Sequence, residues 1–79
     1  MYMVDRRRHV RVPTCIPARI LFNWQYVVDC TIRDLSVGGA CIEVRERHVP
    51  DVFDLIVGDE SELCRVAWRA NDRMGVVFT

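Results

Sequence analysis

Arginine is the residue type that offers binding chemistry near the start of this 79-residue chain. Arg6, Arg7, Arg8 and Arg11 lie within six consecutive positions. A guanidinium group donates paired hydrogen bonds to a guanine edge, stacks on a purine ring, and holds a phosphate with a charge that does not titrate away. The segment therefore has the chemistry to bind a small anion such as a nucleotide. The alternative interpretation is a solvated terminal charge run.

A second candidate site is the polar turn expected after Asp34. The Asp34 carboxylate could accept hydrogen bonds from guanine N1–H and the exocyclic amine. Ser36 and the backbone amides of Gly38 and Gly39 could bind phosphate or base edges, because glycine lets a ligand approach the backbone. We expect these adjacent glycines to adopt positive φ in a tight turn or bulge. The alternative is a turn whose Asp and Ser only cap backbone amides.

The charge is unevenly distributed, although its formal total is zero. All eleven basic residues are arginine, and they balance eleven acidic residues. Residues 5–11 are net positive, so the rest of the chain is net negative. A general nucleic-acid coat needs a broad basic surface, so we expect no nucleic-acid partner. A small anion held at one basic point fits this distribution better.

A nucleophilic active site is not predicted. Ser36 and Ser61 lack the G-x-S-x-G surroundings of a nucleophile elbow, although His9 or His48 could serve as a base. The carboxylates are scattered along the chain. We therefore expect no catalytic residues and no enzyme activity.

The cysteines point to a reducing compartment. Cys15, Cys30, Cys41 and Cys64 form no C-x-x-C pair and have no metal-ligand spacing to histidine, so we expect no metal and no cofactor. Residues 1–12 lack the apolar core of a signal peptide. No apolar run approaches the ~20 residues of a membrane-spanning helix. We expect a cytoplasmic protein without a membrane partner, with reduced and mostly buried cysteines.

Alternating apolar and polar residues predict about six short strands. The expected strands are residues 18–22, 28–34, 40–44, 53–57, 63–70 and 74–78. Turns or connections are expected at residues 23–25, 35–39, 45–51, 58–59 and 71–73. This pattern is typical of a small antiparallel barrel or sandwich, and closure into a barrel removes exposed sheet edges.

The length fits one domain, residues 1–79. We expect residues 1–13 to form a flexible basic N-terminal arm and residues 14–79 to form the β-barrel. Pro13 and Pro17 should keep the arm against the barrel wall and out of the sheet, because proline lacks a backbone donor.

Three side chains have predicted orientations. Trp68 falls on the same alternating face as Cys64 and Val66, which predicts a core position rather than a ligand platform. Arg33 and Arg69 fall on the opposite, outward face of their strands. We expect both to pair with charges on neighbouring strands rather than with a ligand.

Together, in this order and on a small β scaffold, the two motifs resemble those of the PilZ domain family, bacterial receptors for cyclic di-GMP. The family pattern is R-x-x-x-R followed by D/N-x-S-x-x-G. It is matched here by Arg7-x-x-x-Arg11 and by Asp34-x-Ser36-x-x-Gly39. Trp68-Arg69 and residues 74–78 also look like the closing strands of the family, so that the resemblance covers residues 5 to 78.

The resemblance implies a six-stranded antiparallel β-barrel with an arm that wraps over ligand bound on its outer surface. Arg7 and Arg11 would contact guanine and phosphate of cyclic di-GMP. Asp34 and Ser36 would recognise the guanine edge, and Gly39 would keep the surface open.

The neighbouring arginines bear on stoichiometry. An arginine just before the first motif arginine accompanies an intercalated ligand dimer in the family, and Arg6 occupies that place. Arg8 would add a phosphate contact. The resemblance thus implies two stacked ligands per chain.

The chain departs from many family members at its C-terminus, where no helix follows the last strand. The barrel end that such a helix covers would then expose apolar surface, which favours a homo-oligomer. Alternatively, Trp24, Trp68 or Phe78 plugs that end.

The resulting hypothesis is a non-enzymatic cyclic di-GMP receptor whose arm folds over the ligand and signals to a downstream protein. The alternative is a PilZ-type interaction adaptor that binds a partner protein and no nucleotide. A third, less favoured interpretation is a single-strand nucleic-acid binder on an OB-like barrel, which would need exposed aromatics on a basic face.

Overall fold

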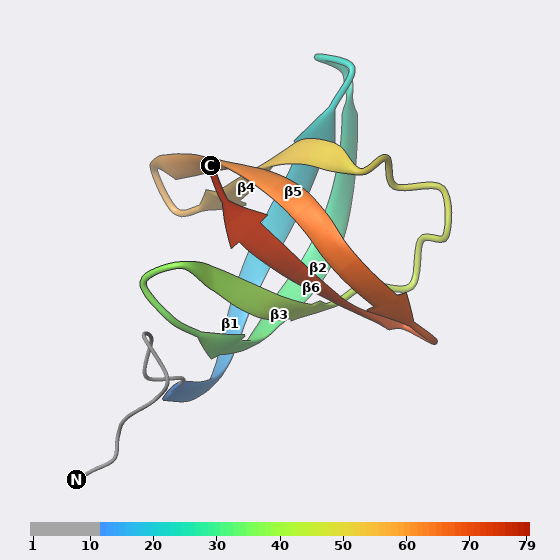
Figure 1. Ribbon diagram of the computed structural model, residues 1–79. Helices are drawn as coiled ribbons and strands as arrows, with labels where there is room; N and C mark the ends of the chain where they lie inside the picture. The colour runs from blue at the N-terminus through green and yellow to red at the C-terminus, as the bar shows by residue number, and fades with distance from the viewer. Residues whose placement is uncertain (1–11) are drawn as a thin grey trace, which may run out of the picture.

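The computed structural model describes residues 12–79, which form six strands and no helix. The strands are β1 (Val12–Phe22), β2 (Tyr26–Leu35), β3 (Gly39–Glu43), β4 (Val52–Val57), β5 (Glu60–Ala70) and β6 (Arg73–Phe78). They close into a barrel in the order β1-β2-β3-β6-β5-β4, and every neighbouring pair is antiparallel (Figure 1). The prediction of a small all-β, six-stranded antiparallel barrel is confirmed.

The barrel interior is filled by the inward residues of the alternating strands. Ile20, Ile32, Ile42 and Cys64 are the largest fully buried side chains. Cys30 is also buried in this core, and small apolar side chains suit the narrow interior of a six-stranded barrel. Cys41 is buried outside the core cluster, Cys15 is exposed, and all four cysteines are free. The expectation that the cysteines are mostly buried is confirmed, since three of the four are buried.

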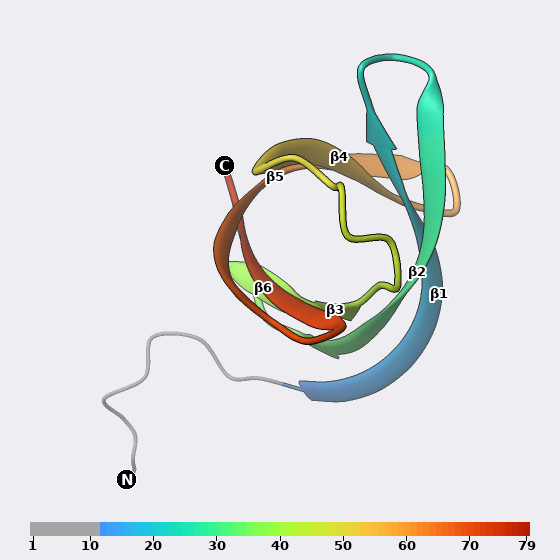
Figure 2. The ribbon, with the colours of Figure 1, turned by 90° about the vertical axis from the view of Figure 1, so that its right-hand side faces the viewer.

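The β1–β2 hairpin projects beyond the rest of the barrel, as Figures 1 and 2 show. The turn falls at residues 23–25 as predicted. Asn23 and Trp24 have φ of 54° and 63°, and Gln25 N donates to Phe22 O at 3.3 Å. Two successive positive φ values match the twist of the flanking strands, as in a type I′ turn. Trp24 is 91% exposed, so it does not plug a barrel end.

Both prolines lie inside β1, so the last residues of the predicted arm, Val12 and Pro13, belong to the sheet; this corrects the expectation that the prolines keep the arm out of it. Pro13 pairs with Asp34 and Pro17 pairs with Thr31 of β2. Strand β4 pairs only with residues 19–21 of β1, so the first part of β1 has a neighbouring strand on one side only. A missing backbone donor is tolerated at such an edge.

The barrel has two distinct ends. The motif end carries the turns at residues 36–38 and 58–59. The opposite, loop end carries the β3–β4 connection, residues 44–51, and the β5–β6 turn at residues 71–72. Figure 2 looks onto the loop end, where the connection crosses the mouth of the barrel.

The two ends are closed by different side chains. At the loop end, Val49 is buried and belongs to the core cluster. Phe78, in the last strand, is partly buried against the same core at the motif end, so it covers that end in part. Within residues 12–79 the structure contains no helix able to span a lipid bilayer.

Candidate ligand-binding site

Asp34 is turned to the outer wall of the barrel by a bulge in β2. The β2–β3 register shifts between Ile32 and Asp34, which leaves Arg33 as the extra residue. Ile32 is buried and Leu35 packs against the core, so the inward positions are three residues apart instead of two. Strict alternation would have placed Asp34 on the same face as Ile32. The bulge therefore presents the Asp34 carboxylate at the surface side, although one of its oxygens is shielded from solvent.

The turn after Asp34 is closed by its own hydrogen bonds. Ser36 N and Ser36 Oγ donate to the carbonyl oxygen of Gly39 at 2.9 and 3.2 Å. Phe78 N donates to the carbonyl oxygen of Gly38 at 2.9 Å, which ties the turn to the end of β6. The Ser36 proton is thus committed to the turn, and its oxygen retains lone pairs that can accept from a ligand.

Gly38 and Gly39 do not adopt the positive φ that we expected. Gly58, in the β4–β5 turn, is the glycine of residues 12–79 that does, with φ of 58°. Gly39 is required for a different reason: a Cβ at this position would overlap the backbone carbonyl oxygen of Val76 on β6. Close approach of two strands, rather than turn conformation, therefore explains this motif glycine.

The start of β1 lies beside the motif turn. Val12 pairs with Leu35, and Pro13 pairs with Asp34. In the sequence, Arg11 directly precedes Val12. The first described residue after the arginine segment, Val12, is therefore placed opposite Leu35, between Asp34 and Ser36 in the sequence of the motif turn.

The arginines predicted to bind ligand, Arg6, Arg7, Arg8 and Arg11, lie outside the described residues. Asp34, Ser36, Gly38 and Gly39, the other predicted site residues, are brought together by the β2–β3 turn.

Trp68 lies on the outer wall, which corrects its predicted core position. The β5–β6 register shifts between Val66 and Trp68, so a bulge at Ala67 reverses the alternation. Trp68 is 46% exposed, and its indole covers Gly75, where a Cβ would overlap the ring. Gly75 in the middle of β6 was the available sequence signal, because an interior strand glycine often marks a close approach.

A lateral row of pairs connects Asp34 with Trp68 across the outer wall. Asp34 pairs with Cys41 of β3, Cys41 pairs with Gly75 of β6, and Gly75 pairs with Trp68 of β5. Small residues separate the carboxylate from the indole. The surface between them therefore carries only short side chains, with the Asp34 carboxylate at one side and the Trp68 indole at the other.

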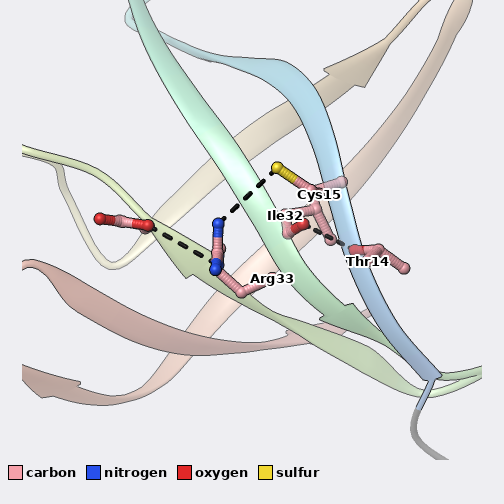
Figure 3. A network of polar contacts seen from close by, with 5 residues as sticks. Thr14, Cys15, Ile32 and Arg33 are labelled. Carbon is pink, nitrogen blue, oxygen red and sulfur yellow. Dashed lines mark hydrogen bonds and ion pairs between the residues drawn. The ribbon is translucent and has the colours of Figure 1, made fainter.

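Arg33 is held by its neighbours on both sides of β2, as Figure 3 shows. Its Nε lies 3.7 Å from Glu43 Oε1 on β3, and its Nη1 donates to Cys15 Sγ on β1 at 3.7 Å. Thr14 Oγ1 also crosses from β1, donating to the Ile32 carbonyl at 2.6 Å. The predicted outward, cross-strand pairing of Arg33 is confirmed, and these contacts brace the bulge that presents Asp34.

Arg69 has the predicted charge partner, but its predicted outward position is corrected. After the bulge at Ala67 it pairs with the buried Met74 and lies on the inward face at the loop end, and its partner Asp51 belongs to the β3–β4 connection. Its Nη2 donates to Asp51 Oδ1 at 2.9 Å and to the Val49 carbonyl at 2.8 Å. Such a partly exposed ion pair contributes ~0–1 kcal/mol, so its main effect is to position the connection before β4.

The buried thiols are poor nucleophiles. Burial, with a smaller contribution from Asp29, raises the pKa of Cys30 to about 11. Burial, followed by Glu62 and Asp54, raises the pKa of Cys64 to about 12. The reactive form of cysteine is the thiolate, so these two side chains serve as core residues near neutral pH.

Comparison with protein families matches the PilZ domain over residues 5–79. A search among curated proteins found no match. PilZ domains are non-catalytic receptors and typically bind cyclic di-GMP. Because the match spans the arginine segment and all six strands, the chain belongs to the PilZ domain family.

Proposed function

We propose that this chain is a cyclic di-GMP receptor that binds its ligand on the outer wall of the barrel, at the motif end. Residues 5–11 lie over the bound ligand, and their arginines contact it from one side. The turn of β2 and β3 contacts it from the other side. The protein performs no chemistry on the ligand, in keeping with its non-catalytic family.

The observation that carries this proposal is the pairing of β1 with β2. Val12 and Pro13 pair with Leu35 and Asp34, so the chain leaves the arginine segment next to the motif turn. This position of Val12 supports the proposal that the two motifs, which are far apart in sequence, meet at one place on the barrel. A cluster of guanidinium groups beside a carboxylate and a hydroxyl provides donors for phosphate and acceptors for guanine N–H groups.

Each motif residue has a separate proposed role. Arg7 and Arg11 donate to guanine O6 and N7 and to phosphate oxygens. Asp34, presented outward by the β2 bulge, accepts from guanine N1–H and the amine. Ser36 accepts through its remaining lone pairs, because its proton is used within the turn.

Two further arginines and one aromatic residue enlarge the proposed site. Arg6 stacks between bases and favours two intercalated ligands per chain, and Arg8 adds a phosphate contact. Trp68 offers an exposed indole across the surface of short side chains from Asp34, where a purine could stack. The ligand dimer would fill the width between these two side chains.

The signal is passed on through the surface that the ligand and the folded arm form together. Ordering each arm residue costs ~1–2 kcal/mol of backbone entropy, and each charge-assisted arginine contact returns ~1.5–3 kcal/mol. Ligand and arm together then present a new surface to a downstream protein, or to a second copy of the chain, in the cytoplasm.

Isothermal titration calorimetry with cyclic di-GMP tests the proposal. We expect saturable heat with two ligands per chain, no detectable binding in Arg7→Ala or Arg11→Ala, and one ligand per chain in Arg6→Ala. Arg19→Ala, an exposed arginine of β1 that pairs with Asp29 and Ile56 away from the motif turn, is the matched control and should bind like the native chain. Circular dichroism verifies that each variant keeps its β structure.

Two results would count against the receptor. Binding that survives both arginine variants would show that the arm is not the ligand contact. Absence of heat with folded protein at high ligand concentration would favour the adaptor, which recognises a partner protein without nucleotide.

A further inference from the structure

An arginine-lined cavity lies at the loop end of the barrel, opposite the motif turn. It has a volume of about 710 Å³ and opens between the β3–β4 connection and the β5–β6 turn. Four of the seven arginines of residues 12–79 line it, namely Arg45, Arg47, Arg69 and Arg73. Figure 2 faces this end of the molecule.

The walls of the cavity are tied together. Val44 N donates to the carbonyl oxygen of Asp72 at 2.8 Å, which joins the connection to the β5–β6 turn. Arg69 Nη2 donates to the carbonyl oxygen of Val49 and to Asp51 Oδ1 at 2.8 and 2.9 Å, which joins the other end of the connection to β5. The cavity is therefore held by contacts at both ends of residues 44–51.

Three of its arginines have no ion-pair partner within residues 12–79. Arg45, Arg47 and Arg73 are exposed, and none of them forms an ion pair with another residue of 12–79. Glu46 Oε2 accepts a hydrogen bond from His48 N at 3.1 Å, so this carboxylate is used within its own turn. An anionic ligand would thus meet guanidinium groups without first breaking ion pairs.

The rest of the barrel has the opposite charge. Outside this cavity, residues 12–79 contain three arginines and eight acidic residues. The arginines concentrate positive potential in the cavity, and the acidic remainder of the barrel repels anions from the other surfaces. Charge complementarity therefore directs an anionic partner to the loop end.

We propose that this cavity binds an acidic segment of a partner protein, with carboxylates paired to Arg45, Arg47 and Arg73. Three guanidinium groups spread around a wide hollow suit several single charges spaced along a chain, because each can grip one carboxylate with two hydrogen bonds. A compact phosphate group suits it less. Glu46 and Asp72 stand among the arginines, and residues 12–79 offer no helix N-terminus at this end.

Fluorescence anisotropy with a fluorescein-labelled peptide of alternating glutamate and serine tests the proposal at low ionic strength. We expect binding that weakens with added salt and is about tenfold weaker in Arg45→Gln/Arg47→Gln. The matched control Arg19→Gln/Arg65→Gln removes the same charge from exposed positions outside the cavity and should bind the peptide like the native chain. Pyrophosphate and a single-stranded oligonucleotide are run as competing ligands.

Equal weakening in both double variants would overturn the proposal, because it would reveal general charge attraction. Failure of the native chain to bind the peptide at low salt would do the same. Tighter binding of pyrophosphate or oligonucleotide, lost in Arg45→Gln/Arg47→Gln, would replace it with a phosphate site. Cyclic di-GMP titration of this variant should be unchanged, so the two sites can fail independently.

Discussion

At the scale of single residues, Gly39 of the binding motif also has a structural role. Gly39 is buried at the start of β3 and lies against the Val76 carbonyl of β6. A side chain here would meet backbone, which cannot rotate away as a flexible side chain can. The close pairing of β3 with β6 therefore depends on the absence of a Cβ.

We expect Gly39→Ala to lower the free energy of unfolding by about 1–3 kcal/mol, because the strands must separate to admit the methyl group. Chemical denaturation followed by circular dichroism measures this change. Gly58→Ala is the comparison: it has open space but a φ of 58°, so only backbone strain of ~1 kcal/mol applies. Equal stability of Gly39→Ala and the native chain would show that the glycine serves the ligand surface alone.

At the scale of elements, irregular positions decide what the strands present. The bulge in β2 turns Asp34 outward, and the bulge at Ala67 turns Trp68 outward. The β1–β2 hairpin holds Trp24 at a φ of 63°, a conformation that costs an L-residue with a bulky side chain ~1 kcal/mol or more. Because Trp24 is strained in the backbone and exposed to solvent, it lowers the stability of this turn.

Trp24→Gly should therefore stabilise the protein by about 1 kcal/mol, because Asn-Gly is the preferred pair for this turn and little buried surface is lost. Thermal unfolding should show Tm raised by ~4–8 °C for a domain of this size. Gln25→Gly, at the next position with ordinary φ, should lower Tm instead. A Tm that falls in Trp24→Gly would show that the indole makes a stabilising contact.

At the scale of the whole molecule, the barrel separates three regions. The core holds neutral thiols, the motif end holds the proposed nucleotide site, and the loop end holds the arginine cavity. An antiparallel barrel places consecutive turns at alternate ends, so ligands at the two ends need not compete. All six strands contribute to one core, so ionisation of a buried core thiol lowers the stability of the entire fold.

The core thiols predict a loss of stability at high pH. In the unfolded chain these cysteines ionise near pH 9, whereas in the barrel burial raises the pKa of Cys30 to about 11 and that of Cys64 to about 12. Below pH 9 both thiols stay protonated in the folded and the unfolded chain, so their ionisation does not reduce the free energy of unfolding. As pH rises above 9, only the unfolded state releases them, so unfolding becomes easier by about 1.4 kcal/mol per pH unit for each thiol.

Urea denaturation between pH 8 and 11, under reducing conditions, measures this slope. Cys64→Ala should lower stability at every pH but give a shallower decline, because one of the two thiols is absent. The same slope in Cys64→Ala and the native chain would contradict the assignment.

Local patterns were sufficient for most of the architecture. Alternation located all six strands, because burial on one face of a strand imposes a period of two on the residues themselves. The turns expected at residues 23–25, 58–59 and 71–73 followed from local polar residues and glycine, and the last one spans 71–72 because Arg73 already belongs to β6. The turn carrying Asp34 and Ser36 was likewise found where the sequence predicted it.

Tertiary structure alone decided three features of the site: the outward position of Trp68, the outward position of Asp34, and the need for glycine at position 39. A bulge exists only relative to the partner strand, which has one residue fewer in the same stretch, and that partner is distant in sequence. The contact of Gly39 with Val76 likewise arises when β3 and β6 pair to close the barrel. Pairing between distant strands leaves no periodic trace in either strand, which is why only the folded barrel shows it.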